Sequence, residues 1–249
     1  MKKISLLVLS LVIVSVVAAC GPAPTPVVQT VNVPQTVVVP QTVVAPQTVV
    51  VVPTAAPTAT ANPASVIPAI PATVAVTLDV KTTALLVLDI NAAVCTVRKS
   101  CVASLPALTA LLKKARDAKV AVIYSEGRTP SPVLPEVAQL PDEPKVSAGA
   151  DKFFNTTLDD ILKGKGIKTA VIVGSASNGA VLYTSFGASL RGYTVVVADD
   201  GMSTDDVFAQ TLTRYQLLNQ PGFANALNTA PQVGRVAVTL SKTDLITFK

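Results

Sequence analysis

The sequence predicts an α/β domain with a mainly parallel sheet covered by helices on both faces, preceded by an extended, disordered stalk. Three observations predict this organisation. From residue 79 onward, short apolar runs of strand length alternate with segments that have helical spacing. Residues 21–78 contain no charged residue and many prolines. Residues 1–20 have the pattern of a cleaved leader. We therefore divide the chain into 1–20, 21–78 and 79–249.

The leader begins with Lys2 and Lys3 and continues with an apolar segment at 4–17. It ends in two alanines directly before Cys20, which resembles the bacterial lipobox. In that motif the cysteine is acylated and becomes the new N-terminus. We therefore expect Cys20 to anchor an extracytoplasmic protein to the bacterial cell membrane. The alternative is a transmembrane helix with an incidental cysteine, for which the apolar run is short.

The stalk at 21–78 carries a six-residue unit, (V/A)PQTVV, three times in succession over residues 33–50. Each proline fixes φ and removes a backbone donor, and it pushes the preceding residue toward an extended conformation. Recurrent proline prevents both a helix and a central strand. At ~3.1 Å per residue, about fifty such residues reach on the order of 150 Å. The stalk is therefore interpreted as a spacer.

Composition excludes several kinds of site. The chain has no His and only three Cys, which excludes Ser-His-Asp and Cys-His catalysis and a Cys-rich zinc site. We expect no metal and no cofactor. The leader holds two of the 20 basic residues, which leaves 18 against 15 acidic ones. No basic run accompanies this small excess, so the sequence does not indicate nucleic-acid binding.

The folded region alternates strands and helices, which indicates parallel pairing with crossover helices. The expected strands are 83–88, 120–124, 169–173, 193–198 and 235–240, and the expected helices are 103–118, 157–163, 180–190 and 205–218. Ligands of such folds bind at the carboxyl ends of the strands. Asp89, the dipeptide Ser125 and Glu126, and the turn after Gly174 follow three of these strands.

Three ordered segments then carry a specific resemblance. They read LLVLDI at 85–90, DKFFNTTLDDIL at 151–162, and GIKTAVIVGSASNGAVLYTSFGASLRGYTVVVADDGMS at 166–203. Together they resemble the isochorismatase-like cysteine hydrolases over nearly the whole region after residue 79. The resemblance implies a three-layer α/β/α fold and a catalytic Asp, Lys and Cys.

The resemblance places two of these three residues. Asp89 matches the acid that ends the first strand. The nucleophilic cysteine directly precedes the position of Val181, and Ala180 stands there instead. The inherited attack on a carbonyl therefore lacks its nucleophile, and we expect the domain not to be an enzyme of the family type.

The lysine is less clear. The family lysine stands several residues before Phe153, close to Ser147, with Lys145 and Lys152 on either side. Neither lysine aligns cleanly, and we take Lys145 as the candidate.

The turn after Gly174 supplies the remaining pocket candidates, Ser177, Asn178 and Gly179, which join Ser125 and Glu126. Backbone N–H groups at such a turn favour an anion or a carbonyl oxygen. A small amide or acid is the expected ligand. The alternative is that Ser177 or Asn178 only caps the following helix.

Cys95 and Cys101 follow Asp89 closely. In an extracytoplasmic protein this spacing favours a disulfide. Left free, Cys95 with Asp89 gives the alternative of an active C–N hydrolase with relocated residues. A third alternative is an assembly module that forms a homo-oligomer. Nucleotide binding is disfavoured because the Gly174 turn lacks the lysine of a P-loop.

Overall fold

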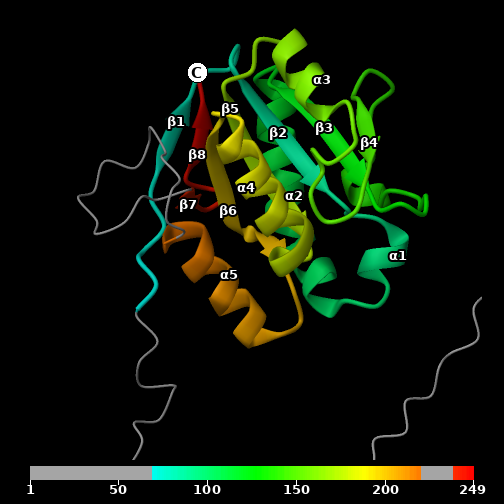
Figure 1. The fold of residues 1–249 in the computed structure, drawn as a ribbon, viewed down its shortest axis with the longest axis vertical. Coiled ribbons are helices and arrows are strands. Elements are labelled where there is room, and N and C mark those ends of the chain that lie inside the picture. Colours follow the sequence, from blue (N-terminus) through cyan, green and yellow to red (C-terminus); the bar gives the residue numbers. More distant parts are fainter. Residues whose placement is uncertain (1–68, 220–237) are drawn as a thin grey trace, which may run out of the picture. The chain divides into compact units, whose positions relative to one another are not determined.

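The computed structural model describes residues 69–219 and 238–249, shown as coloured ribbon in Figure 1. The leader, the stalk up to residue 68 and the segment 220–237 lie outside the described residues. The interpretations of Cys20 and of the PQTVV units fall on this part of the chain.

The main sheet has six strands, and every pair of neighbours is parallel. Its order is β4 (Lys145–Ser147), β3 (Ala121–Glu126), β2 (Thr83–Leu88), β5 (Thr169–Ser175), β6 (Thr194–Ser203) and β7 (Thr239–Ser241). Every residue of β2 is buried. A continuous apolar run is what a strand covered on both faces requires, so this central strand could be recognised in the sequence.

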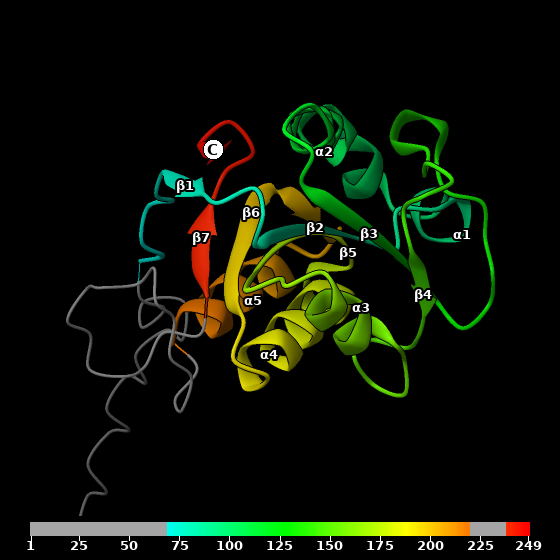
Figure 2. The same cartoon turned by 90° about the horizontal axis from the view of Figure 1, so that it is seen from above.

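Helices cover both faces of the sheet (Figure 2). One face carries α2 (Lys99–Asp117) and a small parallel sheet of β1 (Val76–Leu78) and β8 (Ile246–Phe248). The other carries α3 (Leu158–Gly164), α4 (Leu182–Leu190) and α5 (Val207–Asn219). Three short elements complete the fold: α1 (Ala92–Cys95), a 3₁₀ turn η2 (Pro135–Val137) and a π-helical turn η3 (Ser177–Val181). The predicted three-layer arrangement is confirmed.

The two faces of the sheet bury separate apolar clusters, as the two-residue period of a strand requires. Leu86 and Ile172 belong to the cluster beneath α3, α4 and α5. Leu85 and Val171, their neighbours in sequence, belong to the cluster beneath α2.

The predicted elements differ from the observed ones mainly at their ends. The helix expected at 103–118 begins at Lys99. The strand expected at 193–198 continues to Ser203. The last expected strand, 235–240, corresponds to β7 at Thr239–Ser241, and residues 235–237 lie outside the described part. β1, β4 and β8 were not predicted, because each has only three residues, too few to show a period.

β5 and β2 approach each other closely where both strands end. Gly174 pairs with Leu88 and has a φ of 145°. A Cβ at Gly174 would lie 2.3 Å from the carbonyl oxygen of Leu88. Only glycine fits this position. The segments that follow the two strands, one carrying Asp89 and the other η3, therefore leave the sheet side by side.

Candidate functional site

A buried ion pair between Asp89 and Lys152 forms the centre of the carboxyl edge. Asp89 follows β2 directly, in a left-handed conformation with φ 57° that Asp adopts more readily than most residues. Its Oδ2 lies 2.7 Å from the Nζ of Lys152. Its Oδ1 accepts a hydrogen bond of 2.9 Å from the Oγ of Ser125, at the end of β3. Both carboxylate oxygens therefore have a partner.

The Lys152 side chain is 0% exposed. Besides the Asp89 carboxylate, its ammonium contacts the carbonyl oxygens of Gly149 at 2.8 Å and of Ala148 and Glu126 at 3.3 Å each. An ammonium has three protons to donate, and these four oxygens satisfy them all. Removing an ammonium from water without such partners would destabilise the fold by roughly several kcal/mol. These contacts therefore allow Lys152 to stay buried.

Lys152, and not the favoured Lys145, is thus the lysine that meets Asp89. The side chain of Lys145 is 34% exposed, and its Nζ lies 3.1 Å from the Oε2 of Glu126. Residues alternate between the two faces of a strand. In β4, Lys145 and Ser147 are exposed while the residue between them is buried. Lys145 therefore points away from the buried pair.

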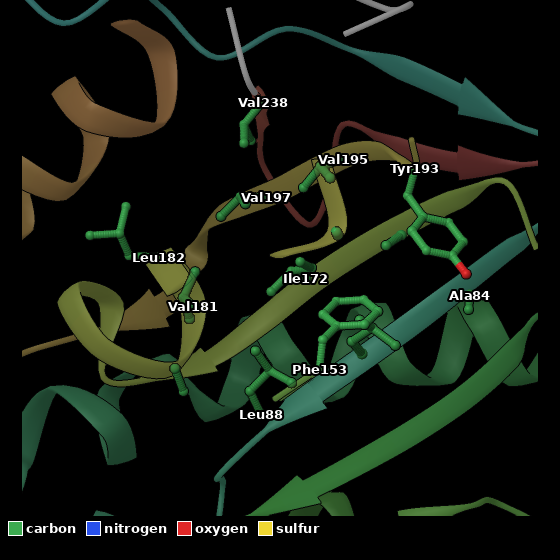
Figure 3. Packing of buried hydrophobic residues seen from close by; sticks show 14 of the residues in the cluster. Ala84, Leu88, Phe153, Ile172, Val181, Leu182, Tyr193, Val195, Val197 and Val238 are labelled. Carbon is green, nitrogen blue, oxygen red and sulfur yellow. The ribbon is translucent and has the colours of Figure 1, made fainter. Parts of the chain in front are cut away.

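Ala180 lies in η3, the turn that follows β5, and is 5% exposed. One helical turn further, on α4, the Oγ1 of Thr184 accepts a hydrogen bond of 3.1 Å from the backbone N–H of Lys152. Leu88, before Asp89, and Val181, after Ala180, belong to one apolar cluster (Figure 3). Position 180 therefore lies at the same end of the sheet as the ion pair, and its side chain is a methyl group and not a nucleophile.

The other candidates in this turn take different places. Ser177 is buried, and its Oγ donates a hydrogen bond of 2.5 Å to the Oε1 of Gln210 on α5. Asn178 is exposed. The residue that caps η3 is Ala176, without a side-chain hydrogen bond. Ser177 and Asn178 therefore do not cap the turn, and Ser177 attaches it to α5.

Cys95 and Cys101 form a disulfide with an S–S distance of 2.03 Å, and both residues are buried. Because a disulfide sulfur is not a thiolate, Cys95 is not available as the relocated nucleophile in this structure.

The loop closed by this disulfide is attached to the ends of β5 and β6. The Nη1 of Arg98 donates a hydrogen bond of 3.1 Å to the Oγ of Ser175, the last residue of β5. The carboxylate of Asp205, after β6, accepts hydrogen bonds from the backbone N–H groups of Lys99 and Ser100 at 3.2 and 2.8 Å. Hydrogen bonds from Ser100 hold the pKa of Asp205 below its ordinary value. Arg98 was not predicted as a site residue, since nothing in the neighbouring sequence distinguishes it from a surface arginine.

The motif residues around Phe153 have a packing role. The guanidinium of Arg191 lies 4.6 Å from the centroid of the Phe153 ring, and the ring of Tyr193 stacks 6.0 Å from it. Tyr193 donates a hydrogen bond of 2.8 Å to Asp159. Burial and this hydrogen bond raise the pKa of Tyr193. Phe153, visible beside Tyr193 in Figure 3, holds the segment that carries Lys152 against the helical layer.

A cavity of about 600 Å³ opens beside Asp89. Its walls come from the segments after β2, β3 and β4, including Asn91, Arg128 and Gly149. Within the described ranges, η3 does not contribute to the wall. The guanidinium of Arg128 lies over Gly149, with Nη2 3.6 Å from where a Cβ would be. Arg128 is exposed, and no carboxylate among the described residues pairs with it.

The isochorismatase domain family matches residues 83–222, more than half of the 249 residues. The chain belongs to this family. No curated protein matches it significantly.

Solved structures agree with this isochorismatase domain in fold. An isochorismatase family protein from Burkholderia thailandensis is 24% identical, with a TM-score of 0.54 over 69% of this chain and 96% of its own. N-carbamoylsarcosine amidase from Thermoplasma acidophilum is 19% identical, with a TM-score of 0.52 over 66% and 97%. The nicotinamidase from Staphylococcus aureus is 18% identical, with a TM-score of 0.51 over 55% and 94%.

The isochorismatase domain thus has an acid and a lysine in contact with each other, and an alanine at position 180 in the turn after β5. Across residues 69–219 and 238–249, no three His, Cys, Asp or Glu side chains gather into a group that could hold a metal ion. In the same residues, no helix combines the length and the hydrophobicity needed to cross a membrane.

Asp89→Asn is expected to lower the free energy of unfolding by about 3–5 kcal/mol, because it leaves the buried Lys152 ammonium without its counter-charge. Asn tolerates the left-handed backbone of position 89, so the effect isolates the charge. The double variant Asp89→Asn/Lys152→Met should regain most of the loss. Urea unfolding measures both. The matched control Lys113→Gln, which breaks the exposed pair with Asp117, should cost less than about 1 kcal/mol. Equal losses in Asp89→Asn and the control would contradict the central role of the buried pair.

Proposed function

We propose that this isochorismatase domain binds a small acid or amide in the cavity beside Asp89 and does not hydrolyse it through a cysteine. The observation that carries the proposal is an alanine at position 180 in a domain that has a complete Asp89–Lys152 pair. A cysteine hydrolase forms a covalent acyl intermediate on its thiolate, and loss of such a nucleophile costs several orders of magnitude in rate. The remaining groups can still bind.

No other cysteine supplies the missing thiolate under this proposal. The sequence has three cysteines. Cys95 and Cys101 are joined to each other, and Cys20 is assigned to the lipid anchor. The mature protein then contains no free thiol.

The charges around the cavity favour an acid over a neutral amide. The Asp89 carboxylate is neutralised by Lys152 at 2.7 Å. Arg128 remains on the wall without a carboxylate partner among the described residues. An unpaired guanidinium matches a carboxylate in geometry as well as charge. The amide alternative would use the Asn91 side chain, which also lines the cavity.

The lipobox pattern at Cys20 supports the second part of the proposal, a lipid-anchored protein on the outer side of a bacterial cell membrane. The uncharged proline-rich segment at 21–78 would then hold the domain away from the bilayer. The disulfide agrees with an oxidising compartment.

Ala180→Cys is expected to create a reactive thiol, because position 180 lies just before the start of α4 and a helix N-terminus lowers a thiol pKa. Alkylation by iodoacetamide, followed by mass spectrometry, should label this variant once per chain and the wild type not at all. The matched control is Ala188→Cys, a buried alanine two turns further on α4. It should react at least ~10-fold more slowly, because it is fully buried and lies near the C-terminal end of the helix.

The same preparations test hydrolysis. Wild-type protein should release no product from nicotinamide or N-carbamoylsarcosine. If the wild type does hydrolyse one of them, and Arg128→Gln or Asp89→Asn abolishes this activity, the catalytic centre has moved. That result would overturn the proposal.

Cys20→Ala is expected to abolish both lipid attachment and leader cleavage in bacterial cells. Labelled fatty acid measures the first and the apparent mass measures the second. Cys101→Ser, which removes a different cysteine, should leave both unchanged. If the wild type accumulates as unlipidated soluble protein, the anchor proposal fails.

A second candidate function, assembly into a homo-oligomer, is favoured by the outer surface of α4 and α5. Val207 and Phe208 at the start of α5 are 80% and 61% exposed, and Tyr183 and Leu190 on α4 are exposed as well. The single charge on these helices, Arg214, is paired with Asp199 at 2.6 Å. An uncharged, exposed apolar surface of this kind is typical of protein interfaces.

On this candidate, Phe208→Lys should convert an oligomer of the chain 21–249 into monomer, because a charge in an apolar interface is not matched. Light scattering after size exclusion measures the mass. Val97→Lys, at a valine exposed elsewhere, is the control and should leave the mass unchanged. A wild-type chain that is monomeric at 100-fold dilution and at high concentration alike would exclude assembly.

A further inference from the structure

A second cavity lies at the N-terminal ends of the sheet's strands, opposite the C-terminal ends where Asp89 lies. Its volume is about 540 Å³, and Lys81, Val120 and Ile167 in its wall precede β2, β3 and β5 respectively. This is where the three central strands begin. Since β2 has six residues, the two edges are separated by about 20 Å at ~3.3 Å per residue. We call this second site the basic cavity.

The basic cavity has an apolar floor and a cationic rim. Val120, Val122 and Ile167 are buried and form its floor. The rim carries the exposed side chains Lys81, Lys119 and Lys165. They come from three different segments of the chain, so the fold and not a local run of sequence brings them to one site.

The wall of the basic cavity carries four basic side chains, Lys81, Arg116, Lys119 and Lys165, against two acids, Asp142 and Glu143. Arg116 in the same wall is neutralised by Glu143, through hydrogen bonds of 2.8 and 2.7 Å. The three rim lysines have no ion pair among the described residues, and Asp142 is the remaining acid of the wall. The C-terminal ends of α2 and α3 reach this edge, but each contributes only about half a negative charge. A small positive excess therefore remains among the residues of the wall.

Lys119 occupies a backbone position that favours glycine. It follows the C-cap of α2 with φ 60°. Its N–H donates to Arg116 and the next N–H, of Val120, donates to Ala115, which is the pattern of a Schellman cap. The corresponding positions after α3 and α4 are Gly166 and Gly192, both with positive φ. The caps of α2 and α3 both border the basic cavity, and the α2 cap carries a lysine where the α3 cap carries a glycine, between Lys165 and Ile167.

We propose that the basic cavity binds an amphipathic organic anion, with an apolar body on the floor and a carboxylate, sulfonate or phosphate at the lysine rim. Apolar floor and cationic rim together select such a ligand over an inorganic ion, which would use the rim alone. The cavity is separate from the Asp89 site, so this inference does not depend on the proposed function of that site.

The probe for the test is 1-anilinonaphthalene-8-sulfonate, added to the chain 21–249, which contains everything after the predicted leader. Its fluorescence should rise with saturable binding, and amide NMR shifts should change at Val120, Val122 and Ile167. Lys119→Gly should raise the dissociation constant of the probe about threefold to fivefold, which is the range expected for the loss of a single exposed ion pair. Its melting temperature should stay equal or rise, since glycine suits the cap. Loss of affinity without loss of stability separates ligand binding from a structural role.

Lys113→Gln is the matched control. Lys113 is also an exposed lysine of α2, but it pairs with Asp117 and does not line the cavity. The Lys113→Gln variant should therefore bind the probe with the same affinity as the wild type. The inference is overturned if Lys119→Gly and Lys113→Gln bind the probe equally well. It is also overturned if the shift changes occur around Asp89 and Arg128 instead.

Discussion

The buried ion pair between Asp89 and Lys152 is the interaction on which the carboxyl edge of the sheet depends. An ammonium without solvent exposure requires partners for its charge and for all its protons. Those partners come from three separate stretches: the residue after β2, the end of β3, and the loop 148–150 after β4. One side chain thus holds three segments in place. The same segments form the wall of the cavity, so the shape of the binding site follows from the stability of the pair.

This dependence explains how the pair persists without a nucleophile. Cys and Ala are both small, and a buried thiol packs much like a small apolar group. An alanine at position 180 therefore leaves no buried charge and little empty space. Removal of Asp89 or Lys152 has a different consequence, because the partner remains as an unpaired buried charge. Stability alone is sufficient to retain the acid and the lysine. Their presence in an isochorismatase domain is therefore not by itself a sign of hydrolysis.

The sequence predicted the larger elements and the acid but not the lysine. The long strands and helices have enough residues to show a period, and Asp89 is conspicuous because it ends an apolar run. Lys152 has no local signal. It stands beside an aspartate and near exposed residues, and its burial results from carbonyl groups that only the folded chain brings together. Lys145 was favoured for its place in the sequence, but the alternation of β4 turns it to the solvent. Ala180 was identified through a motif, since an alanine carries no chemical signal of its own.

The cysteines link the fold to the proposed location. A cysteine with a low thiol pKa is oxidised more readily than an ordinary thiol. In an oxidising compartment such a cysteine would be lost to oxidation, whereas a buried disulfide such as Cys95–Cys101 is stable there. A domain held outside the cytoplasm by a lipid anchor would thus be stabilised by the disulfide. It would also avoid oxidation of a thiol at position 180, because both effects depend on an oxidising compartment. On this proposal, the oxidising compartment accounts for all three features: an acylated Cys20, a disulfide between Cys95 and Cys101, and an alanine instead of a free cysteine at position 180.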